Sequence, residues 1–368
     1  MANCTIKMDK WVSKAKDIQP GIKKPSVSTP VMDAPSGKIY LPLKQGHPYS
    51  GAWLKALDVS DLTVKTVWED LVCSSVLVTE DKLFMSPINL GKKRLICLNK
   101  NDYSVLWIWN DVIRASSNMN PSVGKSDDSI IVADMDGHVY CVDEASQKTN
   151  WHYKCPVDKD ASRSNFYIEN NRLYFGTSKG PSIICLDMNT GKSLWEYGGQ
   201  EKYTGGVLNF CDNALAAQGS ASLMILDKMT GKALADIPYS GYFGRNENDE
   251  MIYTPFQPCA DYPFLYINDI EKGLVCYRYD EGSGLEIQWS FKPENSLTGA
   301  FHILNDKILC ATGDTKGKNN KVHLLEKDSG VELLTAKTKE LAFYIVPCDN
   351  RFFLFSSNGQ IELAHVEL

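Results

Sequence analysis

The sequence predicts an all-β fold, an eight-bladed β-propeller made of four-stranded antiparallel blades. Three observations predict it. A weakly similar unit recurs along the 368 residues, each unit holds short apolar runs bounded by turn residues, and no long segment has helical periodicity. We therefore expect a single propeller domain over residues 1–368.

The repeat is clearest in two stretches that read as strand, turn and strand, SIICLDMNTGKSLW at 182–195 and SLMILDKMTGKALA at 222–235. Aligning further copies on the turn aspartate gives spacings of 39 to 51 residues, which is the length of a four-stranded blade. We call the aligned positions the turn column. Its eight members are Asp58, Asn99, Asp143, Asp187, Asp227, Arg278, Glu326 and His365.

The elements follow in order from this alignment. Residues 24–336 contain the first seven blades, and residues 341–368 supply three strands of the eighth, with no fourth strand after them. We expect residues 5–14 to form the missing strand, so that the first segment of the chain joins the last blade and closes the ring without a long unpaired edge.

The turns explain why the column is mostly short and acidic. Asp and Asn side chains accept hydrogen bonds from backbone N–H groups two residues on, and Gly191, Gly231 and Gly330 then allow a positive φ. The motif Asp187-x-Asn189-x-Gly191 is accordingly read as this turn and not as a calcium loop.

Tryptophans recur after the turn column, and their large rings predict packing between neighbouring blades. A second recurring slot, two residues before the column, holds four cysteines that are predicted to be buried free thiols and not metal ligands. The six tryptophans of this kind are Trp11, Trp68, Trp107, Trp151, Trp195 and Trp289. The four cysteines are Cys97, Cys141, Cys185 and Cys276.

The Ala-Leu-Asp, Thr-Gly-Lys and Trp pattern resembles the repeat of PQQ-binding-like (pyrroloquinoline quinone) β-propellers, most sharply from Gly137 to Trp195. The resemblance implies eight blades docked through tryptophan. Dehydrogenases of this family hold quinone and calcium with a vicinal disulfide and clustered ligands, whereas this chain has no Cys-Cys pair and no matching cluster. It is therefore similar to the non-catalytic members, and we expect no enzyme activity, no cofactor and no metal.

Composition excludes several classes of protein. The net charge of −6 repels nucleic acid and anionic membrane, and no apolar stretch is long enough to span a bilayer. Eleven cysteines without an evident export signal indicate reduced thiols. Six scattered histidines show no ligand or triad spacing and are expected to be structural. We expect a cytoplasmic protein that is monomeric on its own.

Loop variation predicts the binding surface. Connections at 43–51, 110–119, 238–250 and 311–321 vary widely in length, and variable loops on a rigid scaffold usually carry binding. The insert at 239–250 combines aromatics with arginine, as interface hot spots do, although it could equally be a self-packed loop that plugs the channel. The predicted contact residues are Tyr242, Phe243, Arg245, Arg114, His47 and Tyr49.

These patterns predict a non-enzymatic scaffold that binds another protein. The acidic balance favours a basic partner such as a toxin domain with nuclease activity, which would make the chain a bacterial immunity protein. The alternative is an enzyme or small-molecule binder that holds a quinone or sugar in the central channel.

Overall fold

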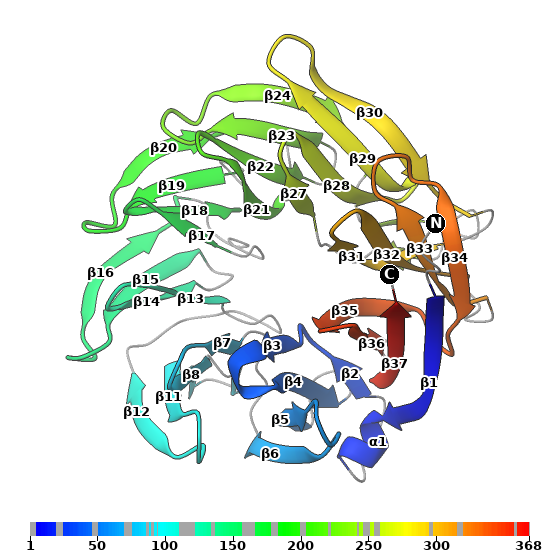
Figure 1. Ribbon diagram of the computed structural model, residues 1–368. Coiled ribbons are helices and arrows are strands. Elements are labelled where there is room, and N and C mark those ends of the chain that lie inside the picture. Colours follow the sequence, from blue (N-terminus) through cyan, green and yellow to red (C-terminus); the bar gives the residue numbers. More distant parts are fainter. Residues whose placement is uncertain are drawn as a thin grey trace. The chain divides into compact units, whose positions relative to one another are not determined.

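Eight antiparallel blade sheets and two two-stranded hairpins are described in the computed structural model, and the blades confirm the predicted eight-bladed propeller (Figure 1). Seven sheets have four strands and the first has five. The chain divides into two compact units, one of Met1–Ser50, Ala56–Lys65 and Ser240–Leu368, the other of Gly51–Lys55 and Thr66–Tyr239. The structure describes residues 5–19, 25–45, 51–69, 76–85, 88–89, 92–93, 95–109, 122–133, 137–156, 166–177, 183–198, 204–219, 222–240, 243–245, 251–253, 258–293, 297–314, 319–356 and 359–367.

Blades are numbered along the chain, and blades two to five belong to the second unit. Each is a meander in which consecutive strands pair. A short hairpin of β9 (Ile88–Asn89) and β10 (Lys92–Lys93) interrupts blade two. The blade strands are β7 (Val76–Val78), β8 (Lys82–Met85), β11 (Leu95–Asn99) and β12 (Val105–Trp109); β13 (Ser122–Ser126), β14 (Ser129–Ala133), β15 (His138–Asp143) and β16 (Thr149–Lys154); β17 (Tyr167–Glu169), β18 (Arg172–Gly176), β19 (Ile183–Asp187) and β20 (Ser193–Tyr197); β21 (Thr204–Cys211), β22 (Ala214–Gly219), β23 (Ser222–Asp227) and β24 (Ala233–Pro238).

Blades six to eight belong to the first unit. The hairpin of β25 (Phe243–Arg245) and β26 (Met251–Tyr253) precedes blade six. The blade strands are β27 (Cys259–Asp261), β28 (Phe264–Asp269), β29 (Gly273–Asp280) and β30 (Gly284–Phe291); β31 (Leu297–Leu304), β32 (Lys307–Gly313), β33 (Lys321–Glu326) and β34 (Glu332–Lys337); β35 (Ala342–Cys348), β36 (Arg351–Ser356) and β37 (Gln360–Glu367).

Two short helical segments lie before or within blade one, and the sequence did not predict them. They are α1 (Ala15–Ile18) and the 3-10 turn η1 (Ala34–Ser36). The sheet of blade one has the order β2-β4-β5-β6, with β3 paired to β4. The strands are β2 (Pro25–Val27), β3 (Val31–Asp33), β4 (Lys38–Gln45), β5 (Gly51–Asp58) and β6 (Val64–Glu69).

The first strand completes the last blade, as predicted. Strand β1 (Thr5–Lys14) pairs antiparallel with β37, from Thr5 opposite Glu367 to Lys14 opposite Gln360. In Figure 1 the blue β1 lies beside the red β37. Ile6 and Met8 pack against the buried cluster of blades seven and eight, so the two ends of the chain share one sheet and one core.

Strand register confirms the turn column in every blade. In seven blades the column residue pairs with the first residue of the second strand, as Asp187 does with Arg172. In all eight, the next residue donates its backbone N–H to the turn between the first two strands, as Met188 does to Asn171 O at 2.9 Å. The alignment therefore holds at Arg278 and His365, where the residue type departs from the pattern.

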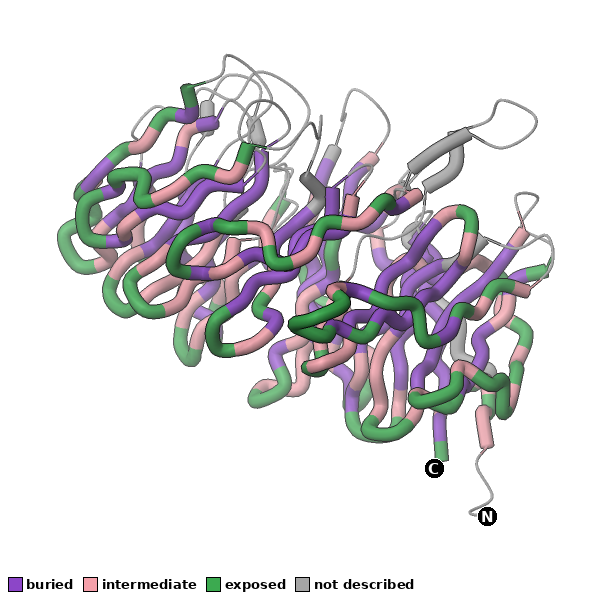
Figure 2. Tube along the Cα trace, turned by 90° about the horizontal axis from the view of Figure 1, so that it is seen from above, coloured by how far each residue is buried: buried purple, intermediate pink, exposed green. Residues whose placement is uncertain are grey.

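Burial follows strand position within a blade. Middle strands such as β18 and β19 are almost wholly buried, because both of their faces pack on neighbouring sheets, and they read as continuous apolar runs. The outer strands β24 and β34 alternate between exposed and half-buried residues. Figure 2 shows the buried strands in purple and the exposed turns in green at their ends.

Candidate partner-binding surface

Tryptophan anchors fix three of the described turns against the preceding blade. Trp195 Nε1 donates to Lys228 O at 3.0 Å, and the same contact joins Trp151 to Met188 O at 2.7 Å and Trp289 to Lys327 O at 3.0 Å. In each case the acceptor is the residue after the turn column. The predicted packing of tryptophan between blades is thus confirmed at these three junctions, and it holds the turns of successive blades side by side.

Ion pairs at the same positions add a second link between blades. Lys228 Nζ lies 2.5 Å from Glu169 Oε2 of the preceding blade, and Lys327 Nζ lies 2.5 Å from Asp261 Oδ2. Both lysines directly follow the turn column. The two lysines therefore neutralise the half-buried Glu169 and the exposed Asp261 of the preceding blades, and they leave the outer ends of the turns to other side chains.

Those outer ends are acidic in the first unit. First-to-second and third-to-fourth turns lie at one end of an antiparallel blade, so their side chains form one surface, which we call the turn surface. Within the described turns 34–37, 58–63, 261–264, 280–284, 304–307, 326–331 and 348–351 no lysine or arginine is exposed. The exposed acidic residues of these turns are Asp61, Asp261, Asp280, Glu281, Asp306, Glu326, Asp328 and Asp349.

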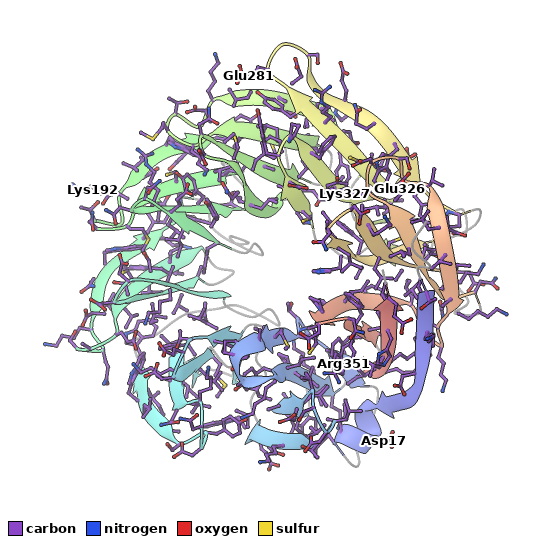
Figure 3. The ribbon with its side chains drawn as sticks, viewed as in Figure 1. Asp17, Lys192, Glu281, Glu326, Lys327 and Arg351 are labelled. Carbon is purple, nitrogen blue, oxygen red and sulfur yellow. The ribbon has the colours of Figure 1, made fainter. Side chains whose placement is uncertain are left out.

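Glu281 and Glu326, labelled in Figure 3, come from the turns of adjacent blades six and seven. The labelled Arg351, by contrast, is only half exposed and donates from Nη1 to Val59 O of blade one at 2.9 Å. Arg351 therefore joins two blades, and the exposed charged side chains of these turns are the acidic ones.

The turn surface of the second unit is acidic to a lesser degree. Six acidic residues of its turns are exposed, against three lysines, one of which is Lys192, labelled in Figure 3. The acidic residues are Glu80, Asp81, Asp102, Asp127, Asp128 and Asp212. The remaining lysines are Lys148 and Lys232.

Hydrogen bonds within the turns keep several of these carboxylates ionised. Bonds from Ser104 lower the pKa of Asp102, and backbone N–H groups of Gly282 and Ser283, at 2.9 and 3.2 Å, lower the pKa of Asp280. Hydrogen bonds to the charged form favour that form. The turn surface thus stays negative well into mildly acidic conditions.

Of the residues predicted to contact a partner, two lie on a described strand. Phe243 and Arg245 are the first and last residues of β25, paired with Tyr253 and Met251. The others lie outside the described residues, so the prediction that all six form one interface stays a prediction. They are Tyr242, Arg114, His47 and Tyr49. The acidic turn surface was missed, although counting charges in the first-to-second turns would have indicated it.

The cysteine slot is confirmed as structural. Cys97, Cys141, Cys185 and Cys276 are free, buried and paired with the anchor tryptophans of the outer strands. Burial raises the pKa of Cys185 to about 11, so its thiol is protonated at neutral pH and a poor nucleophile.

One chain of side chains has the residue types of a catalytic triad. His323 Nε2 lies 2.7 Å from Thr312 Oγ1, and His323 Nδ1 lies 2.6 Å from Glu332 Oε2. Thr312 and His323 are both 2% exposed. A hydroxyl this deeply packed is positioned to satisfy the buried imidazole, which is the role the contacts support.

The described ranges contain no group of three or more His, Cys, Asp or Glu residues placed to hold a metal ion. None of their helices is both long and apolar enough to cross a membrane.

The blades, the turn column and the tryptophan anchors define a repeat β-propeller. A family model, described as outer membrane protein assembly factor BamB, matches residues 53–335, and the chain belongs to this family of PQQ-like β-propellers. The comparison with curated proteins found no match.

Solved structures share the fold at low identity. BamB from Moraxella catarrhalis is 16% identical with a TM-score of 0.63, over 98% of this chain and 100% of that one. Sqt1 from Saccharomyces cerevisiae is 14% identical with a TM-score of 0.67, over 94% and 97%. The computationally designed Ika8 protein is 10% identical with a TM-score of 0.68, over 94% and 98%.

Proposed function

We propose that this protein is a non-enzymatic scaffold that binds a basic partner protein at its turn surface. The observation that carries the proposal is the turn surface of the first unit, where eight acidic residues and no lysine or arginine are exposed in the described turns. Two of the eight, Asp261 and Asp306, form ion pairs with the less exposed Lys327 and Lys307. Charge of one sign over a rigid surface steers an oppositely charged partner and accelerates association.

The family supports a protein partner. Its model carries the description of an assembly factor, and assembly is work done on other proteins. PQQ-like propellers of this kind commonly serve as scaffolds for protein interaction. We extend that role to this chain, and the rigid anchoring of its turns by tryptophan suits a surface that docks without rearrangement.

A finer form of the proposal names the partner as a basic toxin domain and this chain as its cytoplasmic immunity protein in a bacterium. Its support is the net charge of −6, which favours any basic partner and not toxins alone. The competing function is a small-molecule or quinone enzyme that uses the central channel, and the described residues offer it no cluster for a metal ion.

Variants of two surfaces test the proposal in a single experiment. The turn variant carries Asp280→Asn, Glu281→Gln, Glu326→Gln and Asp328→Asn. The asparagine at 280 keeps the turn hydrogen bonds, because its side-chain oxygen accepts them as aspartate does. The insert variant carries Tyr242→Ala, Phe243→Ala and Arg245→Ala. Each full-length variant is compared with the wild type in cross-linking mass spectrometry and co-purification from the source cells.

We expect the turn variant to lose the co-purified protein and the insert variant to keep it, with wild-type binding weakening as salt rises. Loss in the insert variant alone would move the interface to the 239–250 insert and overturn the turn surface. Binding that is equal in both variants and insensitive to salt would overturn a charge-driven scaffold altogether.

A further inference from the structure

Two histidines of blade three face one another across neighbouring strands. His138 Nδ1 on β15 lies 2.8 Å from His152 Nε2 on β16. Their rings are nearly coplanar, with an angle of 11° and centroids 5.0 Å apart. Two imidazole nitrogens thus face one another at the distance of a hydrogen bond, and imidazole is the commonest ligand of divalent transition metals in proteins.

Aromatic packing holds the pair in place. The ring of Tyr140 stacks on His152 with centroids 4.5 Å apart and an angle of 13°. Trp109 of blade two meets Tyr140 edge to face at 5.3 Å and is itself 3% exposed. A ligand pair supported by packed neighbours keeps its orientation and loses little freedom when a metal binds.

The repeat supplies an internal comparison for both positions. Because all blades share one register, residues equivalent to His138 and His152 can be read from the other blades. Positions equivalent to His138 are Trp53, Ser222, Gly273, Lys321 and Gln360. Positions equivalent to His152 are Ile108, Glu196, Asp236, Ser290 and Thr335. Among these described equivalents there is no histidine, so the fold does not require the pair.

The pair is accessible to an ion from solvent. His152 is exposed and His138 is half exposed, so an ion can reach them from solvent. Lys154 lies opposite His138 in the strand register, so its positive charge is close to the two imidazoles. Lys154 also repels a cation and so limits the affinity.

We propose that His138 Nδ1 and His152 Nε2 chelate one divalent transition ion of the zinc or copper class, with water at the remaining positions. Nitrogens bound at about 2.0 Å in a tetrahedral site are roughly 3.3 Å apart, so the pair opens by about 0.5 Å. The hydrogen now shared between the two nitrogens moves to the outer nitrogen of its own ring.

Metal titration of the full-length chain tests the site. Protein stripped with a chelator is titrated with Zn²⁺ by calorimetry and with Co²⁺ by visible spectroscopy. Cobalt bound by imidazole and water lacks the charge-transfer band of cobalt thiolate, which separates this site from the free cysteines of the chain. We expect one ion per chain, and at least tenfold weaker binding in His138→Ala and in His152→Ala.

Matched variants separate ligation from folding. His365→Ala removes a histidine that lies 3.3 Å from Asp9 in blade eight and should leave binding unchanged. Lys154→Gln keeps both ligands and should tighten binding several-fold, because it removes a positive charge beside them. If His138→Asn with His152→Asn unfolds at the wild-type temperature and still binds one ion with wild-type affinity, or if the wild type binds none, the proposal is wrong.

Discussion

The indole of Trp195 lies against the backbone of Gly231 in the next blade, so closely that a Cβ on this glycine would come within 2.5 Å of the ring. Gly231 has a φ of +70°, and the same arrangement joins Trp151 to Gly191. One residue thus serves two needs. It allows the positive φ that closes the turn, and its bare Cα makes room for the anchor of the neighbouring blade.

Gly231→Ala should therefore destabilise the protein by about 2 kcal/mol or more, because it adds strain at positive φ to a clash with the half-buried ring of Trp195. Gly198→Ala is the matched control. It follows β20 in the same blade as Trp195, and nothing lies within 4 Å of its added Cβ. Chemical denaturation of both variants gives the comparison, and equal stability of the two would contradict this account of the turn.

The ion pair of Lys228 and Glu169 should behave as a partly buried pair. Lys228 is 4% exposed at its side chain and Glu169 31%. Glu169→Gln leaves the buried ammonium without its counter-charge and should cost about 1–3 kcal/mol of unfolding free energy. Adding Lys228→Met to Glu169→Gln should recover much of that loss, because the change removes the unpaired charge and the apolar methionine side chain still packs in the same place. Lys7→Met at the exposed pair with Glu367 should change stability by less than about 0.5 kcal/mol.

A failure of Lys228→Met to rescue Glu169→Gln would show that the carboxylate acts through another contact. Urea denaturation of the two single variants and the double variant forms a cycle that measures this coupling directly.

The blade plan could be predicted because it rests on local chemistry repeated along the chain. Asp187 and Gly191 specify one turn, and the same residue types at Asp227 and Gly231 specify the next. A weak match at one copy of the repeat can therefore be aligned with the help of the others. The predicted strand at 5–14 was confirmed as β1 for a different reason. A last blade with three strands leaves an edge that another segment must cover.

Contacts between blades could not be predicted, because they join residues far apart in sequence. The pair of Lys327 and Asp261 spans 66 residues, and no pattern marks which lysine meets which acid. The two histidines of blade three lie on a bulged hairpin, where an extra residue in β16 shifts the register between Cys141 and Val142. A prediction from strand alternation alone does not include that shift in register. The contact between the two histidines was therefore not predicted either.

Closure by the first strand makes a prediction for residues 5–14. Ile6→Asp places a charge where the side chain packs on the cluster that contains Phe352 and Val366. We expect β1 to detach, the free edge of β37 to associate with other copies, and the melting temperature to fall. Lys7→Gln, on the opposite face of the strand, is the control, because it puts no like charge beside Glu367. Size-exclusion chromatography and thermal unfolding measure both effects, and a monomeric Ile6→Asp variant with wild-type melting would refute closure by β1.

The buried His323 predicts how stability depends on pH. Desolvation, the largest cause, and the charge of Lys321 lower its pKa below 6.5, against a smaller opposing effect of Glu332. A histidine with a lowered pKa binds fewer protons folded than unfolded, so its contribution is intact above pH 6.5 and is lost as the pH falls below that value. The neighbouring groups Thr312 and Phe291 do not titrate in this range.

Thermal unfolding between pH 7.5 and 5 should therefore show a melting temperature that falls with acidity. The free energy of unfolding should fall by at most about 1.4 kcal/mol per pH unit from this group. His323→Gln should start from a lower stability and lose less of it over the same range. Glu332→Gln should lose more, because removing the carboxylate lowers the pKa of His323 further and carries the loss to lower pH. Parallel curves for the wild type and both variants would show that His323 does not titrate in this window.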